Sequence, residues 1–566
     1  MDRMESVDLN AAADAYAGAP LLNCLLREAA DPAEECAVTT DDAHAGRVHR
    51  LRGSGRLLRV RGGRRPVRPE LRTAEGWRPL SHTELVKLTA DELHRCTGAA
   101  NDELPVEIAD SREAVAALLA ARAAAAPPQD PYVLSEQSLV MGHPYHPAPK
   151  ARGGAPAGSW LPYAPEAYAR FPLVFLGLRE DQVAEEGGPA AAGAIDSLAG
   201  LLDGPRPPAG YRLLPAHPWQ LDLAGCSAAV REAFADGRLL RLGPGRLPVW
   251  PTASIRTLYV PGERNGERDL FVKFSLDVRI TNDVRRLWRH DLLKLRRTDA
   301  AVEAGFADLR SSGSNAVWLA DRGYRTAAFA FEELAVLVRD GLHAQVEPGA
   351  TPLASAALAE GFAGSPLAAT SDPVGWWRAY LRHVVPPVLD LFARHGVVLE
   401  AHLQNTLVAV DAQGMPVQAL FRDAEGVKLL PDVEREAAWQ RLVYCLVVNH
   451  LTEVAGALAE EHPDAAAAVW PAAREEFLRY DAERGLPEIA ELLSAPALPA
   501  KTNLLLRWTR ADGADARYIP LPNPLRVQPL SAAARSTASD GAVGRWDPAK
   551  VGWDRGLPSF KGIDQC

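Results

Sequence analysis

Residues able to hold a metal ion flank two apolar runs within EAHLQNTLVAVDAQGMPVQALFRDAEG, residues 400–426. TLVAV and VQALFR have the composition of strands around a tight turn, which predicts a β-hairpin. Asn405 directly precedes the first strand and Asp423 directly follows the second, so both should lie at the hairpin's open end. An amide oxygen beside a carboxylate is a suitable partial shell for Mg²⁺. Each residue taken singly is more often a turn cap or a surface group.

Hydroxyls and cations form a second candidate group in a hairpin expected between SIRTLYV and DLFVKFSLDVRI, which flank PGERNGER with its Asn-Gly turn signal. The second run alternates apolar and polar residues as one continuous strand through position 280, so one face should be core and the other free for a site. The residues of the free face and the turn that would form a polyphosphate cradle are Ser254, Arg256, Thr257 and Lys273. A surface hairpin with outward charges is the plainer interpretation.

An arginine and a hydroxyl stand four residues apart where TNDVRRLWRHDLLKL is expected to begin a helix. Thr281 or Asn282 would be the N-cap of this helix, and Arg285 would lie one turn along. A helix N-terminus that presents an arginine beside a hydroxyl can receive a carboxylate or phosphate. A purely structural cap explains the pattern equally well.

The proline-stiffened loop GHPYHPAPKARGG carries His143, His146, Lys150 and Arg152. Two histidines three apart suggest a metal pair, but zinc sites normally need a third clear ligand, and the His-Pro context is unfavourable for a regular helix. Contact with phosphate or nucleotide is therefore favoured over zinc. Lys501 precedes an apolar run in LPAKTNLLLRW, where a lone lysine is usually solvated.

Several common catalytic motifs are absent from the sequence. It contains no G-x-x-x-x-G-K-[ST], G-x-G-x-x-G, G-x-S-x-G or H-E-x-x-H, so Walker-type ATPases, Rossmann dehydrogenases, α/β-hydrolases and zincins lose their main support. AHPWQ, residues 216–220, is a rigid turn to which we assign packing rather than chemistry.

The elements that must position these residues fall into three zones along 566 residues. Residues 1–128 hold an N-terminal helix, an Arg-rich meander over 47–72 and two further helices, the second capped by Asp110 or Ser111 and ended by PPQDP. Residues 129–345 hold the SIRT hairpin. Residues 346–566 hold long amphipathic helices, one of which Pro386 and Pro387 should kink or divide, and the hairpin over 400–426. Helices and strands occur in blocks, which predicts an α+β fold.

Composition limits the setting of the site. The chain is 47% hydrophobic and 24% charged with a net charge of −10, typical of a globular protein and unfavourable for nucleic-acid binding. No apolar run of membrane-spanning length and no signal peptide is apparent, so we expect a cytoplasmic protein without membrane contact. The six cysteines are scattered and form no C-x-x-C pair, as in a reducing compartment. The Arg-rich meander is interpreted as a solvated sheet face, with an anion-binding or partner surface as the alternative.

The ordered set of motifs resembles one enzyme family. GHPYHPAPKARGG, SIRTL followed by VKFSLDVRITNDVRRL, EAHLQN, FRDAEG, and KTNLLLRW with a following NPL occur in this order between about 131 and 525. They are similar to the siderophore synthetases that act independently of nonribosomal peptide synthetases, the aerobactin synthetase (IucA/IucC) family. The N-terminal zone matches none of the family's motifs.

The resemblance implies a cupped hand, with thumb-like residues 1–128, fingers-like residues 129–345 and palm-like residues 346–566. It implies that ATP and Mg²⁺ are used to adenylate a carboxylate of citrate or a related polycarboxylic acid, which an amine or alcohol then attacks to give an amide or ester. It leaves a homodimer open. A small-molecule kinase with the same Mg²⁺–ATP site, and a scaffold protein without activity, are the rival hypotheses.

Residue roles follow from the same resemblance. ATP would contact His143, His146, Lys150, Ser254, Arg256, Thr257, Lys273, Gln404, Asn405 and Asp423. The metal would be held by Asn405, Asp423 and Glu400. The carboxylate substrate would be oriented by Thr281, Arg285, His402 and Lys501. Arg285 would also offset charge between the α-phosphate and the carboxylate, and His402 would be a second catalytic residue, either orienting the substrate or also taking a proton.

Overall fold

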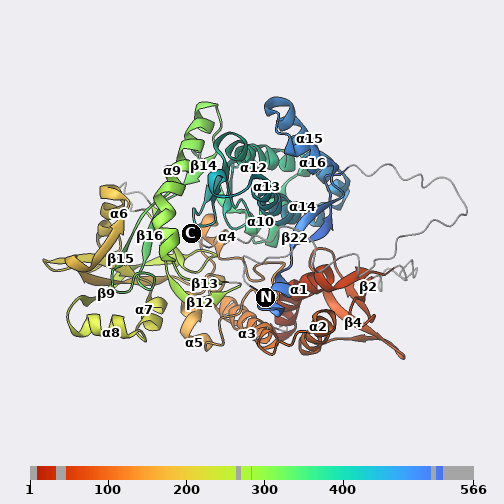
Figure 1. Ribbon diagram of the computed structural model, residues 1–566, viewed down its shortest axis with the longest axis horizontal. Coiled ribbons are helices and arrows are strands. Elements are labelled where there is room, and N and C mark those ends of the chain that lie inside the picture. Colours follow the sequence, from red (N-terminus) through yellow and green to blue (C-terminus); the bar gives the residue numbers. More distant parts are fainter. Residues whose placement is uncertain (1–8, 34–45, 263–268, 282, 512–517, 527–566) are drawn as a thin grey trace, which may run out of the picture.

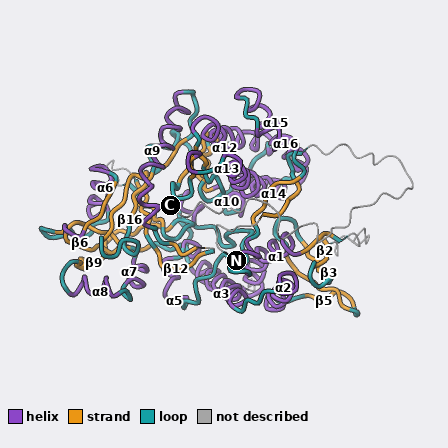
Figure 2. The backbone as a smooth tube through the Cα atoms, in the orientation of Figure 1, coloured by secondary structure: helices purple, strands orange, loops and turns teal. Residues whose placement is uncertain are grey.

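The computed structural model describes residues 9–33, 46–262, 269–281, 283–511 and 518–526 (Figure 1). Strands gather on the left and at the lower right of the molecule, whereas the long C-terminal helices lie together above them (Figure 2). The predicted mixture of helix and sheet is therefore confirmed. The expected domain boundaries near 128 and 345 stay a prediction.

The N-terminal region combines three helices with a sheet (Figure 1). Five antiparallel strands follow one another in chain order, which confirms the predicted Arg-rich meander. Ser81 begins the second helix through a capping box with Glu84. The elements are α1 (Leu9–Ala29), β1 (Ala30–Pro32), β2 (Arg47–Leu51), β3 (Leu57–Arg61), β4 (Val67–Thr73), β5 (Gly76–Pro79), α2 (His82–Thr97) and α3 (Glu103–Ala124).

The N-cap expected at Asp110 or Ser111 is wrong, because α3 already begins at Glu103. Both side chains have another task. The Asp110 carboxylate accepts a hydrogen bond from the backbone N–H of Arg152 at 2.7 Å, and the Ser111 hydroxyl accepts one from that of Lys150 at 3.0 Å. These two residues thus fix the loop that follows His143.

An eight-stranded sheet forms the middle of the chain, in the order β7-β15-β16-β11-β10-β9-β6-β8. Its strands are β6 (Phe171–Arg179), β7 (Val183–Glu186), β8 (Tyr211–Ala216), β9 (Leu239–Pro251), β10 (Thr257–Val260), β11 (Leu270–Phe274), β15 (Asp321–Ala327) and β16 (Val336–Asp340). The helices of this part are α4 (Pro131–Glu136), α5 (Ala157–Trp160), α6 (Gly188–Leu201), α7 (Pro218–Ala224), α8 (Ala228–Ala235) and α9 (Arg289–Ser311).

The SIRT hairpin is confirmed, since β10 and β11 pair antiparallel with Thr257 opposite Lys273. The Asn265-Gly266 turn lies outside the described residues. The expected single strand through position 280 is wrong, because the chain leaves the sheet at Ser275 to bond Ala335 and Leu287. Residues beyond it form β12 (Leu276–Ile280), which pairs with β13 (Asp283–Arg285) in a separate two-stranded sheet.

The helix expected to begin at Thr281 or Asn282 starts later. Residues 283–285 are a strand, and α9 begins at Arg289 after Trp288. Thr281 has a φ of 60°, a left-handed conformation that starts a turn rather than a helix. Asn282 lies outside the described residues. Arg285 is thus held at the end of a short strand and not in a helical first turn.

The C-terminal region surrounds a four-stranded sheet, β14-β20-β19-β17, in which β19 and β20 form the predicted hairpin. The strands of the whole region, including those of smaller sheets, are β14 (Val317–Leu319), β17 (Thr351–Ala354), β18 (Val397–Val398), β19 (Thr406–Val410), β20 (Pro416–Arg422), β21 (Lys428–Leu429), β22 (Ala497–Lys501) and β23 (Tyr518–Pro522). Its helices are α10 (Ser355–Glu360), α11 (Pro366–Ala369), α12 (Pro373–His395), α13 (Arg435–Val443), α14 (Thr452–Glu461), α15 (Ala466–Arg484), α16 (Glu488–Ser494) and α17 (Asn503–Trp508).

The helix α12 and the helix that contains a π-helical segment are two long helices of the C-terminal region. Pro386 and Pro387 do not divide α12, whose buried apolar sides pack throughout its length, and Gly396 ends it in a left-handed conformation. A π-helix over Tyr444–Leu451 joins α13 to α14. The resulting helix, Arg435–Glu461, is long and apolar enough to cross a membrane, but 72% of its apolar window is buried, as in a core helix.

Candidate active site

The open end of the β19–β20 hairpin brings together the two residues expected there. The backbone N–H of Arg422 donates to the carbonyl of Asn405 at 3.0 Å, so Asn405 and Asp423 flank the last rung of the ladder. The Arg422 guanidinium is buried and pairs with Glu136 at 2.7 Å, and it also bonds the carbonyl of Gln404. The hairpin end is therefore anchored to α4 and held rigid.

A buried lysine faces the carboxylates that follow β20. Lys273 of β11 has a side chain only 2% exposed, and its Nζ lies 2.8 Å from Asp423 and 2.7 Å from Glu425. Burial alone would raise the pKa of Asp423, but the ammonium of Lys273 and the guanidinium of Arg339 hold it well below its usual range. Both carboxylates are therefore ionised at neutral pH, and positive charge from β11 and β16 surrounds them.

The SIRT turn contributes the next cation. Arg256 is buried and reaches Glu425 at 2.9 Å, while its other nitrogen donates to the carbonyl of Arg285 at 3.0 Å. The Ser254 hydroxyl accepts from the backbone N–H of Thr257 at 3.2 Å. The turn thus joins the hairpin β10–β11, the β13 strand and the loop after β20.

Three non-glycine residues of this site adopt left-handed backbone conformations. The φ angles are 63° for Ile255, 60° for Thr281 and 82° for Asp423. Such conformations are costly, most of all for a β-branched residue like Ile255, and they tend to occur at functional sites. Each occurs at a turn that places one of the predicted site residues.

Arg285 and Thr281 meet as their spacing suggested, although no helix connects them. The Arg285 guanidinium donates to the Thr281 hydroxyl at 2.6 Å and to the Ile280 carbonyl at 2.7 Å. Burial and the charge of Arg256 lower the pKa of Arg285. No described carboxylate lies within ion-pair distance of Arg285, so its charge is available to an anion.

Glu400 and His402 lie on the turn that enters β19. Glu400 forms an ion pair with Arg441 of α13, and its carboxylate packs so closely on Gly426 that a Cβ there would lie 1.7 Å from Oε2. Burial lowers the pKa of His402, although Glu400 and Asp423 oppose this. His402 is therefore neutral at pH 7, and its Nδ1 accepts from the backbone N–H of Gln404 at 3.3 Å.

The His143 loop divides into a part near the site and a part that supports it. Burial lowers the pKa of His143 to about 4, and interactions with His402, Arg27 and Lys501 act in the same direction. His146 is almost completely buried and caps its own turn. Lys150 is also buried and is taken up by Glu166 and the Leu139 carbonyl. The ammonium of Lys150 thus has a carboxylate partner.

Lys501 ends β22 and has no carboxylate partner within ion-pair distance among the described residues. Burial lowers the pKa of Lys501, and so does the charge of Arg441. Lys501 is half-buried, so a bound anion would relieve the cost of its partial desolvation.

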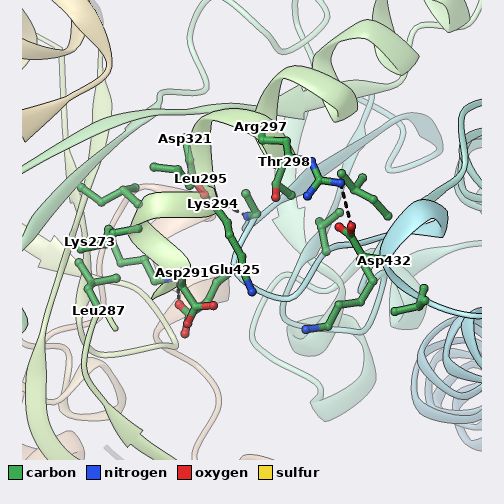
Figure 3. A pocket seen from close by; sticks show the side chains of 17 residues that line it. Lys273, Leu287, Asp291, Lys294, Leu295, Arg297, Thr298, Asp321, Glu425 and Asp432 are labelled. Carbon is green, nitrogen blue, oxygen red and sulfur yellow. Dashed lines mark hydrogen bonds and ion pairs between the residues drawn. The ribbon is translucent and has the colours of Figure 1, made fainter. Parts of the chain in front are cut away.

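A cavity of about 340 Å³ opens beside Lys273 and Glu425 (Figure 3). Asp291 and Glu425 lie close together at one side of it, and the Arg297–Asp432 ion pair lies at the other (Figure 3). Between them, apolar side chains from α9, β16 and residues 427–433 line the wall together with polar ones such as Lys294 and Thr298. The apolar residues of that wall include Leu287, Leu292, Leu295, Leu337, Val427 and Leu429.

No described group of three or more His, Cys, Asp or Glu side chains is arranged to hold a metal by itself. Mg²⁺ needs no such group, because it commonly takes one or two carboxylates and completes its shell with phosphate and water. The ionised Asp423, with Asn405 beside it and Glu400 on the adjoining turn, fits that requirement.

Comparison with known proteins adds the family. The model of the "IucA / IucC family" matches residues 131–360, and that of a "Ferric iron reductase FhuF-like transporter" matches residues 375–516. The resemblance of the motifs to the IucA/IucC family is confirmed over residues 131–360. The matched range contains the His143 loop, the SIRT turn and Arg285.

Relatives and solved structures of the IucA/IucC type cover most of the chain. An L-2,3-diaminopropanoate–citrate ligase of Staphylococcus aureus is 27% identical over 70% of this chain and 75% of its own length. The rhizobactin siderophore biosynthesis protein RhbC of Rhizobium meliloti is 29% identical over the same shares. The structure of ATP-bound aerobactin synthetase IucA from Klebsiella pneumoniae has a TM-score of 0.77 at 22% identity, and it covers 91% of this chain and 100% of the other. That structural likeness establishes the fold.

Sequence reasoning missed four residues of this candidate site. Glu425 follows Asp423 by two positions in FRDAEG, and that spacing was the one signal that could have found it. Arg339 and Asp321, an ion pair at 2.6 Å, come from neighbouring strands of the large sheet and carry no local signal. Arg441 approaches Glu400 from a helix 41 residues later.

Proposed function

We propose that this chain is an ATP-dependent siderophore synthetase that adenylates a carboxylate of citrate or a related polycarboxylic acid and joins it to an amine or alcohol. The observation that carries the proposal is the buried Lys273, held between Asp423 and Glu425 beside Arg256. Dense charge of both signs suits a polyphosphate with its counter-ion. The relatives supply the acid, since their names specify citrate ligases.

ATP would bind with its phosphates on Lys273, Arg256 and the hydroxyls of Ser254 and Thr257, and with its base in the cavity beside them. These cations are paired with Glu425 and Asp423 in the absence of ligand, so the phosphates would take over part of that pairing. Asp423, Asn405 and Glu400 would hold Mg²⁺, which supplies charge neutralisation for the phosphates. His143 would lie at the edge of this site, and Lys150 and His146 would support its loop.

Adenylation makes a poor electrophile reactive. A carboxylate oxygen attacks the α-phosphorus of ATP and pyrophosphate leaves, giving an acyl adenylate. Arg285, which has no described carboxylate partner, would offset the negative charge that accumulates at the α-phosphate. Thr281 and Lys501 would orient the acid.

The second step forms the product. The amine or alcohol attacks the acyl carbon, and AMP and a proton are released. When His402 is neutral and its Nδ1 accepts from Gln404, its proton resides on Nε2. We therefore favour His402 as a hydrogen-bond donor that orients the acid or the adenylate, rather than as the base.

The thumb, fingers and palm of the related enzymes would correspond to residues 1–128, 129–345 and 346–566, and the protein would act in the cytoplasm. The test is product analysis with a panel of carboxylic acids and hydroxylamine as a general nucleophile. AMP, pyrophosphate and a hydroxamate are expected with a polycarboxylate. ADP as the product would instead identify a kinase. Arg285→Ala should abolish the reaction with the fold intact, whereas Arg246→Ala, at an exposed arginine, should not.

A further inference from the structure

Arg27 is a cation of the N-terminal region for which no role has been assigned. It lies in the last turn of α1, is half-buried, and its guanidinium carbon stands 3.3 Å from the ring centroid of Tyr145. No described carboxylate lies within ion-pair distance of it. The carboxylate next to it in sequence, Glu28, is already used, because it accepts from the backbone N–H groups of Leu504 and Leu505 at 3.0 and 2.8 Å.

Tyr145 connects Arg27 to the His143 loop and to the segment that follows Lys501. Its backbone N–H donates to Nδ1 of His143 at 3.0 Å, and its carbonyl accepts from Asn503 at 2.7 Å. Asn503 stands two residues after Lys501. Asn23, one turn before Arg27, donates to the carbonyl of Pro144 at 3.2 Å. The end of α1, the His143 loop and the segment after β22 therefore meet around one ring.

The positive charges at this junction favour the binding of an anion. Arg27 and Lys501 both bring positive charge, and both depress the pKa of His143. Neither has a described carboxylate at ion-pair distance. Stacking on Tyr145 occupies the face of the Arg27 guanidinium. The N–H edges of Arg27 have no acceptor among the described residues, and such edges match a carboxylate in a two-point contact. Two cations in this state suit an acid with more than one carboxylate.

We propose that Arg27 is a specificity-determining residue, whose guanidinium binds a carboxylate of the acid substrate other than the one that is activated. The inference rests on the proposed function. The end of α1 would then form part of the acid site. The enzyme would distinguish acids by the number of carboxylates that they carry. Lys501 then serves the same end of the acid from the opposite segment.

The experiment compares Arg27→Gln, Arg27→Met and Arg27→Lys with the wild-type chain. ATP–pyrophosphate exchange gives KM and kcat for citrate, for a dicarboxylic acid and for ATP. In the two neutral variants the KM for citrate should rise at least tenfold with the KM for ATP unchanged, and the preference for citrate over the dicarboxylic acid should shrink. Arg27→Lys should fall between them and the wild type. Arg50→Gln, an exposed arginine of the same region, is the matched control and should behave as wild type.

Other results would overturn the inference. These are an unchanged KM for citrate, an equal rise for both acids, or a change confined to ATP, each measured in variants whose Tm matches the wild type. Arg27→Met is included because Arg27→Gln alone can impair folding. The Met side chain preserves the apolar stacking on Tyr145 and provides an independent test of the lost charge.

Calorimetric binding of citrate without ATP separates this inference from the proposed function. If the wild-type chain binds citrate but forms no AMP, and Arg27→Gln abolishes the binding, the inference is supported and the proposed activity is wrong. If the chain turns over citrate and substitutions of Arg27 have no effect, the proposed activity is supported and the inference is wrong.

Discussion

His450 Nδ1 lies 2.8 Å from the carbonyl oxygen of Ala401, the residue between Glu400 and His402. Burial lowers the pKa of His450 to about 4, so the ring is neutral and its Nδ1–H donates to that carbonyl. Its Nε2 faces the Tyr380 hydroxyl, which also bonds Ser355. The π-helix that carries His450 thus fixes the turn on which two predicted site residues lie.

Removing that hydrogen bond should loosen the turn. His450→Leu leaves the Ala401 carbonyl without its donor, and we expect the free energy of unfolding to fall by about 1–3 kcal/mol. Urea denaturation measures the change. His450→Gln, which can still donate, should lose less, and equal stability of all three chains would contradict the role of this contact.

Lys273 offers a sharper test of the charge cluster. Lys273→Met leaves Asp423 and Glu425 without their shared ammonium, so the free energy of unfolding should fall by about 3–5 kcal/mol, and the KM for ATP should rise at least tenfold. Denaturation and ATP–pyrophosphate exchange measure the two effects. Lys87→Met changes an exposed lysine of α2 and should leave both quantities near wild type. A wild-type KM for ATP in Lys273→Met would remove Lys273 from the phosphate site.

Asp299 predicts a pH dependence. It is buried, accepts from Trp318 Nε1 at 2.7 Å and from the Asp321 N–H at 3.0 Å, and its other oxygen has no partner among the described residues. Burial and the nearby Asp321 carboxylate raise the pKa of Asp299 to about 7, above an unfolded value of about 3.9. The folded state therefore binds the extra proton, so this group's stabilisation is complete below about pH 4 and is lost as pH rises towards about 7.

Asp299→Asn should remove that loss while retaining an acceptor for Trp318. The difference in stability between variant and wild type should shift in favour of the variant as pH is raised from 4 to 8. Denaturation curves across this range measure it, and a difference that does not change with pH would contradict a raised pKa.

The parts of the site that sequence could predict are those governed by local periodicity. Asn405 and Asp423 meet because a hairpin places the residues before and after its strands side by side, and Thr257 faces Lys273 for the same reason. Arg285 and Thr281 also meet, but through a left-handed turn where a helix was expected. Helix-start patterns such as TND do not distinguish a cap from a turn.

The parts that could not be predicted depend on contacts between distant segments. Arg339 reaches Asp423 from β16 at 3.3 Å, and Arg27 approaches the His143 loop from the far end of the chain. Lys150 pairs with Glu166, a partner that no pattern in the sequence indicated. A lysine's partner is decided by tertiary packing, which one sequence does not reveal.

Arg64 tests how the N-terminal sheet is attached. At the turn between β3 and β4 it pairs with Glu453 at 2.9 Å and Glu460 at 3.0 Å, and the Glu453 side chain is only 1% exposed. Arg64→Met leaves Glu453 buried without its partner and should lower the free energy of unfolding by about 3–5 kcal/mol. Arg78→Met breaks an exposed pair with Glu84 and should lower the free energy of unfolding far less. Urea denaturation measures the free energy of unfolding of both variants. Equal decreases would show that the ion pairs of Arg64 stabilise the fold no more than an exposed pair does.

The two carboxylates of FRDAEG, Asp423 and Glu425, should have different functions. Asp423 lies beside Asn405 and is the proposed metal ligand, whereas Glu425 binds Arg256 and Lys273 and competes with phosphate for them. Asp423→Asn should raise the Mg²⁺ concentration for half-maximal rate at least tenfold. Glu425→Gln should leave that concentration unchanged and leave the KM for ATP equal or lower, since it frees two cations. Titrations of Mg²⁺ at saturating ATP, and of ATP at saturating Mg²⁺, measure both. If Glu425→Gln shifts the Mg²⁺ titration and Asp423→Asn does not, then the metal is held by Glu425 and the hairpin end serves only to position the loop.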